Sequence, residues 1–157
     1  QIPANVEYPQ NARSVAADLC NAESIPSIVT KDLNAVYVLH GIMSSGSEAD
    51  FELGMGGNVY STMNLLEALR KTCPGVRVIY ASSMAVYGRP FPDVVHNGVI
   101  PTPQSSYGAE KIVCETLIND YTRRKFIVGF TLRLPSIVVR PGKPTAAASS
   151  FLSGYLF

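Results

Sequence analysis

The hydrophobic positions of the chain form three unbroken runs, at residues 33–41, 76–81 and 126–134. Runs of this kind, rich in Val, Ile and Tyr, are typical of strands that are covered on both faces, as in a parallel sheet. A shorter apolar stretch at residues 14–19 predicts one more buried strand nearer the N-terminus. The chain is therefore expected to contain a parallel β-sheet.

Stretches of helical periodicity separate these runs. Apolar residues recur at helical spacing over residues 48–71, although glycines between residues 54 and 57 weaken that helix locally. A second helix is predicted over residues 105–124, and a short one over residues 23–30. The alternation of strand and helix predicts an α/β fold, a doubly wound parallel sheet with helices on both faces.

Composition narrows the class of protein. The chain is 46% hydrophobic and 16% charged, with a formal net charge of +1, which suits a soluble globular domain and gives no basic patch for nucleic acid or an anionic membrane. No apolar run is long enough to span a bilayer. Four prolines between residues 88 and 103 predict a long loop, which indicates function or disorder.

The cysteines and histidines exclude two kinds of site. The three cysteines are far apart and odd in number, so a disulfide framework is not expected, and a reducing, cytoplasmic location is favoured. His40 and His96 have no nearby Cys or His partner, so no metal site is expected.

One helix carries a pair of residues suited to acid/base chemistry. Tyr107 and Lys111 are four residues apart and share a helix face, so the ammonium can lower the pKa of the phenol and make it a general base. The strand at 76–81 runs directly into Ser82 and Ser83, and the carboxyl ends of parallel strands face the ligand crevice. The alternative is that the serines are turn residues and that Tyr107 only caps a helix.

A second pair with the same spacing serves as a comparison. Tyr121 and Lys125 lie at the end of the same predicted helix, in the basic sequence Tyr-Thr-Arg-Arg-Lys. Such a turn is typical of a solvated helix end, so this pair is interpreted as structural.

The residues around Tyr107 carry a family resemblance. The stretch VIYASSMAVYG, followed by PTPQSSYGAEK, resembles the active-site signature of extended short-chain dehydrogenases, the NAD-dependent epimerase/dehydratase family. The resemblance implies that Ser83 holds the reacting oxygen, that Tyr107 is the acid/base, and that Lys111 binds the nicotinamide ribose and tunes the tyrosine. Asn58 matches the asparagine that supports this lysine through water.

The resemblance also implies NAD as the cofactor. ADL at residues 17–19 resembles the turn whose acidic residue meets the adenine amine, VYVLHG resembles the strand that ends beside the cofactor, and LRLPSIVVRPG resembles the strand and loop whose proline approaches the nicotinamide. The implied cofactor-binding residues are Asp18, Leu19, Leu39, His40, Gly41, Ser82, Tyr107, Lys111 and Pro135.

Some features depart from the family pattern. No glycine-rich turn for a pyrophosphate follows a strand, which implies a partial Rossmann domain over residues 1–157, beginning near the third strand of the usual fold and ending before the C-terminal substrate domain. The second strand, which would discriminate NAD from NADP, is not present. Val38 stands where the family has histidine, and His40 where alanine is common.

A narrower resemblance concerns the substrate. GIMSSGSEADFELG and RPGKPTAAASSF resemble D-erythronate dehydrogenases and their fungal relatives, which implies NAD-dependent oxidation of the C2 hydroxyl of a sugar acid. Ser83, Tyr107 and Arg140 are then expected to contact the substrate, with Arg140 or Lys143 facing its carboxylate unless these are ordinary loop charges. The alternatives are a nucleotide-sugar epimerase or dehydratase, and a non-catalytic remnant or NAD sensor. A homodimer through the helices that hold Asn58 and Tyr107 is implied for the full-length protein.

Overall fold

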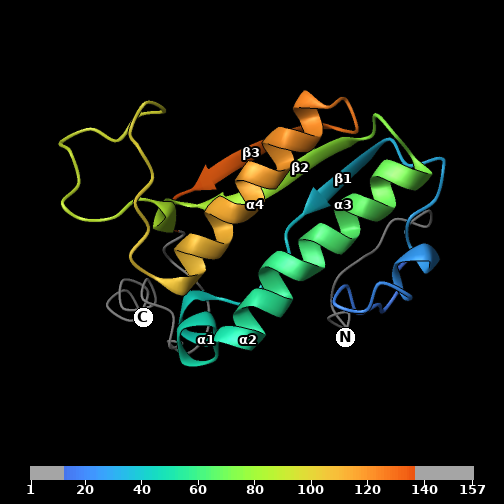
Figure 1. Ribbon diagram of the computed structural model, residues 1–157, viewed down its shortest axis with the longest axis horizontal. Coiled ribbons are helices and arrows are strands. Elements are labelled where there is room, and N and C mark those ends of the chain that lie inside the picture. The colour runs from blue at the N-terminus through green and yellow to red at the C-terminus, as the bar shows by residue number, and fades with distance from the viewer. Residues whose placement is uncertain (1–12, 137–157) are drawn as a thin grey trace.

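Three parallel strands form the centre of the molecule (Figure 1). The computed structural model describes residues 13–136. The strands are β1 (Ala35–Val38), β2 (Arg77–Ser83) and β3 (Val128–Leu134), hydrogen-bonded in the order β1-β2-β3. All the pairs are parallel. The three apolar runs are therefore adjacent parallel strands, as the sequence predicts, and the fold is a partial Rossmann-like α/β domain.

The helices follow the predicted positions but differ in their bounds. Two long helices, α3 (Ser61–Thr72) and α4 (Ser106–Arg123), cross the sheet. The shorter elements are η1 (Ile25–Ser27), α1 (Ser44–Ala49), α2 (Phe51–Gly54), the π-helix η2 (Met55–Tyr60) and η3 (Met84–Val86). No helix within residues 13–136 is long and apolar enough to cross a bilayer.

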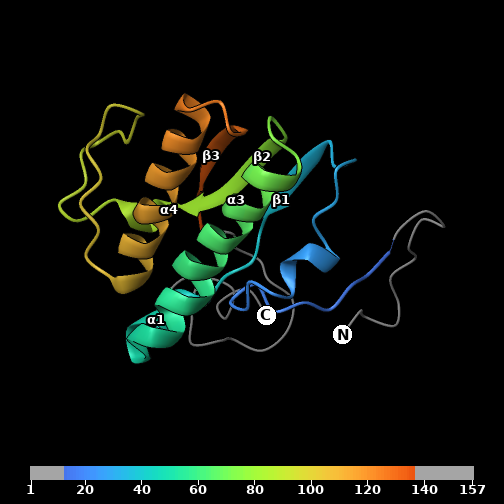
Figure 2. The same cartoon turned by 45° about the vertical axis from the view of Figure 1, so that its right-hand side comes forward.

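One face of the sheet is covered and the other is open. Figures 1 and 2 show α3 and α4 on the same face of the strands. On β2, Val78 and Tyr80 point to these helices and are almost fully buried. On the opposite face, Tyr37 of β1 is 67% exposed and Phe130 of β3 is 52% exposed. The expectation of helices on both faces is therefore not met within the described residues, because an apolar run does not specify what covers it.

The hydrophobic core lies between the sheet and the two long helices. It joins Leu66 and Leu69 of α3 to Cys114 and Ile118 of α4, all with 0% exposure. Burial of an aliphatic side chain of this size contributes roughly 1.5–3 kcal/mol. The core therefore fixes α4, which carries Tyr107, and α3, which continues directly from the π-helix that carries Asn58, against the sheet.

The N-terminal part of the described chain differs from its prediction. Residues 14–19 are irregular and mostly exposed rather than a buried strand. The expected helix at 23–30 shortens to the 3₁₀ turn η1, in which only Ile25 is buried. The apolar stretch at 14–19 is too short and too rich in small side chains to hold a place in the sheet.

The helix predicted over residues 48–71 has a break and a change of pitch. It begins earlier, at Ser44, and is interrupted at Asp50, whose carboxylate accepts from Leu53 N at 2.9 Å and caps α2. The glycine-rich stretch then forms a π-helix, an element often found at functional sites. A side chain at Gly54 would clash with Glu110 Oε1, and one at Gly57 would clash with Ile42. The glycines therefore permit close approach to the residues below the site.

Candidate active site

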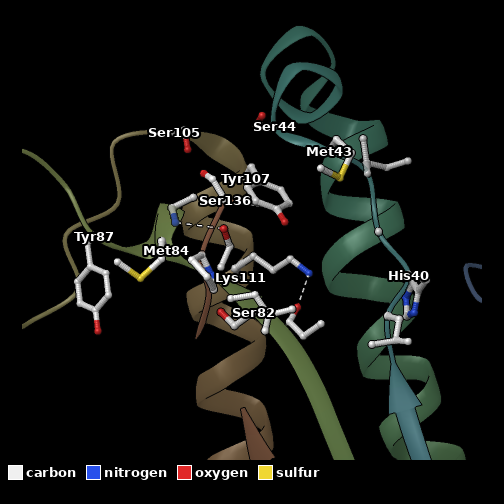
Figure 3. Close-up of a pocket in the computed structure, with 18 of the residues that line it drawn as sticks. His40, Met43, Ser44, Ser82, Met84, Tyr87, Ser105, Tyr107, Lys111 and Ser136 are labelled. Carbon is white, nitrogen blue, oxygen red and sulfur yellow. Dashed lines mark hydrogen bonds between the residues drawn. The ribbon is translucent and has the colours of Figure 1, made fainter. Parts of the chain in front are cut away.

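A cavity of about 520 Å³ lies at the carboxyl ends of the strands (Figure 3). This is the edge of a parallel sheet where ligands bind in open α/β folds. Most of the predicted site residues share this position. Those lining the cavity are Leu39, His40, Gly41, Ser82, Ser83, Tyr107, Lys111 and Pro135.

Three predicted residues lie elsewhere. Asn58 is buried below the cavity wall and does not line it. Leu19 lines a neighbouring apolar groove of about 290 Å³ along β1, which shares His40 with the cavity. Asp18 lies in the adjoining turn, where its carboxylate accepts from Cys20 N at 2.9 Å, so its role at an adenine stays a prediction.

Two predicted substrate residues cannot be placed. Arg140 and Lys143 lie outside the described residues.

Ser83 is the last residue of β2 and the N-cap of η3. Its Oγ accepts from the backbone N–H of Ala85 at 3.1 Å, which caps the short helix. That bond uses a lone pair and leaves the hydroxyl proton available to a ligand in the cavity. The turn therefore fixes the position of a hydrogen-bond donor at the strand end.

Tyr107 lies in the first turn of α4. The start of this helix is fixed because the Ser105 hydroxyl accepts from Gly108 N at 3.2 Å and the Glu48 carboxylate accepts from Ser106 N at 3.0 Å. Burial raises the pKa of Tyr107, the Ser83 hydroxyl lowers it, and the charge of Glu110 raises it. The expected lowering of the Tyr107 pKa by Lys111 is therefore not found in this structure: burial has the largest effect, and Lys111 is not among the groups that shift this pKa.

Lys111 is a buried ammonium at the floor of the cavity. It is 4% exposed, and its Nζ donates to the backbone carbonyl of Ala81 at 2.9 Å. The Nζ also lies 4.7 Å from the ring centroid of Tyr80 and 5.5 Å from that of Tyr107. Burial lowers the pKa of Lys111. The lysine is thus held by a carbonyl and two aromatic rings.

Asn58 binds the backbone that follows β1. Its Oδ1 accepts from Ile42 N at 2.8 Å, and its Nδ2 donates to Ile42 O at 3.1 Å. The side chain is 2% exposed. The direct role of Asn58 in this structure is therefore to fix the cavity wall at Ile42, and the water-mediated support of Lys111 stays a prediction.

A buried carboxylate orients Asn58. Glu110 is 2% exposed, and its Oε2 accepts from Asn58 Nδ2 at 2.5 Å and from Ser47 Oγ at 2.8 Å. Its Oε1 has no hydrogen-bond partner in the described part of the chain. The sequence does not reveal this residue, because a glutamate in a helix is ordinarily solvated; the absent side chain at Gly54 makes room for it.

His40 is hydrogen-bonded to a serine hydroxyl beside the cavity. Its Nε2 lies 2.8 Å from Ser61 Oγ, and the Ser61 hydroxyl also lies within donating distance of Gly57 O, at 2.7 Å. Burial, followed by the charge of Lys111, lowers the pKa of His40. The lowered pKa favours the neutral ring at neutral pH.

Several residues that line the cavity were not predicted from the sequence. Met43 and Ser44 follow β1, Met84 follows β2, and Phe91 belongs to the proline-rich loop. Their proximity to strand ends is the one signal that indicates the first three. Phe91 carries no such signal, because it lies in a long irregular loop.

Two hydrogen-bond groups tie the ends of that loop together. Gly88 N donates to Thr102 Oγ1 at 3.3 Å. The side-chain amide of Gln104 binds both backbone groups of Arg89, with N–O distances of 3.1 Å in each direction. The loop therefore leaves and returns at one fixed place beside the cavity.

Tyr121 is separate from the cavity. Its hydroxyl donates to Glu67 Oε1 on α3, and its ring meets the Phe126 ring edge to face at 5.7 Å. Burial and the neighbouring Glu67 raise the pKa of Tyr121 to about 12. The structural interpretation of the Tyr121 and Lys125 pair is consistent with this packing between helices.

The cavity suits one end of a dinucleotide cofactor. Its donors include the ammonium of Lys111 and the hydroxyls of Ser83 and Tyr107, which match the hydroxyls of a ribose and a reacting oxygen. No group of three or more His, Cys, Asp or Glu side chains within residues 13–136 is arranged to hold a metal ion. The chemistry of the site is therefore that of hydroxyl and ammonium groups.

Fold and site define the class of protein. The chain belongs to the NAD dependent epimerase/dehydratase family, whose model matches residues 2–155. Among individual proteins, it is 44% identical over 132 residues to a D-erythronate dehydrogenase from Haemophilus influenzae, covering 84% of this chain and 42% of that protein. A D-erythronate dehydrogenase from Cupriavidus necator is 46% identical over 144 residues, covering 92% and 44%.

Solved structures give the same fold. The crystal structure of a nucleoside-diphosphate-sugar epimerase from Agrobacterium tumefaciens has a TM-score of 0.84 at 38% identity, covering 94% of this chain and 46% of that one. A monomeric L-threonine 3-dehydrogenase from a metagenome has a TM-score of 0.79 at 23% identity, covering 96% and 49%. The chain therefore spans less than half the length of these relatives.

Proposed function

We propose that the complete protein is an NAD-dependent dehydrogenase that oxidises the C2 hydroxyl of a sugar acid such as D-erythronate. The observation that carries the proposal is the convergence of Ser83, Tyr107 and Lys111 on one cavity at the strand ends. The two relatives named D-erythronate dehydrogenase, at 44% and 46% identity, support this substrate class.

The proposed mechanism assigns one task to each of the three side chains. Tyr107 takes the proton of the substrate hydroxyl, and Ser83 donates a hydrogen bond to the same oxygen. Lys111 binds the ribose beside them, and its charge favours the phenolate once the site is filled. When bound, the nicotinamide supplies the acceptor for the hydride that leaves the carbon.

The cofactor-binding residues divide into two groups. Leu39, His40, Gly41, Lys111 and Pro135 would hold the nicotinamide end, since all five line the cavity. Asp18 would meet the adenine, by analogy with the family turn. The substrate carboxylate would pair with Arg140 or Lys143.

A nucleotide-sugar epimerase or dehydratase is the second candidate. Its support is the likeness to the nucleoside-diphosphate-sugar epimerase structure, at 38% identity. A sugar acid is favoured because the two dehydrogenases are more similar in sequence.

A direct test compares substrates. The complete protein would be assayed for NADH formation with D-erythronate and, separately, for conversion of UDP-sugars. NADH formation that requires the sugar acid supports the proposal. Conversion of a UDP-sugar without net NADH formation would replace it with the second candidate, and inactivity toward both would favour a non-catalytic role.

We also propose a homodimer of the complete protein through the helix pair. Three apolar side chains are exposed on η2, α3 and α4, the elements around Asn58 and Tyr107: Tyr60 (50%), Met63 (39%) and Val113 (41%). Light scattering should give twice the protomer mass, and Met63→Glu should shift it toward the monomer. A monomer under all concentrations would overturn the dimer without affecting the chemistry.

A further inference from the structure

The ammonium of Lys111 lacks the usual partner of a buried charge. No Asp or Glu carboxylate in the described part of the chain lies within 4.0 Å of it, and its hydrogen bond goes to one backbone carbonyl, Ala81 O, at 2.9 Å. Buried charges are ordinarily paired because desolvation penalises the charged form. Another feature of the site must therefore stabilise this ammonium.

An aromatic ring lies against the ammonium on the sheet side. The Tyr80 ring centroid is 4.7 Å from Lys111 Nζ, within the range of a cation–π interaction, and the ring is 1% exposed. A cation–π interaction is stronger when both groups are desolvated, as they are here. Tyr107 offers a second ring at 5.5 Å, but its face also lines the cavity.

The hydroxyl of Tyr80 does not hold the lysine, because the hydrogen bond of Lys111 Nζ goes to Ala81 O. The hydroxyl is buried without a hydrogen-bond partner among the described residues. The Cys114 thiol donates to the Asn58 carbonyl at 3.4 Å. Burial, followed by Cys114, raises the pKa of Tyr80. The part of Tyr80 that meets the ammonium is therefore the face of its ring.

We infer that Tyr80 is a positioning residue for the proposed catalytic lysine: its ring face holds the Lys111 ammonium against the Ala81 carbonyl and keeps it protonated in the dry floor of the cavity. The importance of this arrangement for catalysis rests on the proposed function, whereas the interaction itself can be measured without turnover.

Four other titratable groups surround the lysine. His40 faces it from the segment after β1, and its ring is neutral. Tyr107, Glu110 and Cys114 face it from α4, where charge on Glu110 or Cys114 would favour the ammonium. None of them forms an ion pair with it. A titration of Lys111 must therefore be compared between variants that leave all four in place.

The experiment varies the electron density of the ring while keeping its shape. Tyr80→Phe and then phenylalanines with increasing numbers of fluorine atoms at position 80 would be made in the 157-residue chain. The titration of Lys111 would be followed by NMR of labelled lysine, with the signal assigned by its loss in Lys111→Met. Exposed Lys125 provides an internal reference in the same spectra.

Each outcome decides the inference. We expect Tyr80→Phe to match the wild type within about twofold, and full fluorination to shift the protonation equilibrium toward the amine by about 3- to 10-fold, with intermediate rings in order. The inference is overturned if fluorination leaves the Lys111 titration unchanged, or if Lys111 is already neutral in the wild type. A separate outcome is that the complete wild-type protein proves inactive toward D-erythronate while fluorination still shifts the Lys111 titration in order. That result would overturn the proposed function and leave the role of Tyr80 standing.

Discussion

The side-chain amide of Asn58 and the backbone of Ile42 form a closed pair of hydrogen bonds, at 2.8 and 3.1 Å. This pair joins the π-helix η2 to the segment that lines the cavity after β1. A side chain at Gly41 would clash with Asn58 Oδ1, so the glycine at φ +147° allows the two segments to approach. The wall of the cavity is thus fixed from below by one amide.

Replacement of Asn58 by alanine should destabilise the chain. The change leaves both backbone groups of Ile42 without their partner, at a cost of about 2–4 kcal/mol in the free energy of unfolding. Urea denaturation measures it. Asn64→Ala is the matched control, because this amide also binds backbone carbonyls, at 3.2 Å, but in an exposed turn, so it should cost less than about 1 kcal/mol. Equal costs for the two variants would contradict the buried role of Asn58.

Two neighbouring glycines should respond oppositely to alanine. A Cβ at Gly54 would meet Glu110 Oε1 and the backbone of Ser47, so Gly54→Ala should lower the free energy of unfolding by about 1–3 kcal/mol. A Cβ at Gly56 meets no atom within 4 Å, so Gly56→Ala should be neutral or stabilising by up to about 1 kcal/mol. Thermal unfolding of the pair compares them. Stabilisation by both would show that Glu110 does not pack against this turn.

His40 should make stability depend on pH in mildly acidic solution. Its pKa in the folded chain lies below the ordinary 6.5, so the unfolded chain takes up the proton more readily and the folded state loses stability as the pH falls from 7 toward 5. His40→Gln should remove part of this slope, at most about 1.4 kcal/mol per pH unit. A steeper acid loss in His40→Gln than in the wild type would reverse the assignment.

Two tyrosines with the same spacing to a lysine should differ in turnover. General-base catalysis contributes typically 10²–10⁴-fold, so Tyr107→Phe should cut kcat of the complete protein by at least that range with little change in substrate affinity. Tyr121→Phe removes a hydroxyl bound to Glu67 between helices and should leave kcat nearly unchanged. Steady-state kinetics decide between them, and the opposite ranking would mean that the wrong tyrosine has been assigned.

The 157-residue chain alone should bind NAD weakly or not at all. The cavity can hold the nicotinamide end, but the sequence has no glycine-rich turn to receive a pyrophosphate. Calorimetry is expected to give a Kd of about 1 mM or weaker, and Lys111→Met should abolish any residual binding. Low-micromolar affinity would mean that other groups of this chain bind the phosphates.

Part of this structure can be read from the sequence. The apolar runs predicted three parallel strands because runs rich in Val, Ile and Tyr are typical of the strands of a parallel sheet. The location of Ser83 and Tyr107 followed from the strand end and the helix start. Both inferences rest on patterns within short segments, so they do not depend on how the rest of the chain packs.

Other features depend on contacts between distant segments. The open face with Tyr37 and Phe130 could not be foreseen, because burial depends on what packs against a strand. The Glu110 side chain can point inward because Gly54 leaves space for it, and this glycine lies 56 residues earlier in the chain. The predicted lowering of the Tyr107 pKa failed because spacing along a helix does not report desolvation.

The tethering of the proline-rich loop bears on how this active site can diversify. Gly88 and Arg89 are bonded to Thr102 and Gln104, so the loop between them begins and ends at the same anchored spot. Lengthening a surface loop costs little free energy once its ends are fixed. Mutation can therefore exchange or extend the segment that brings Phe91 to the cavity, and so alter the shape of the cavity, while Ser83 and Tyr107 keep their places.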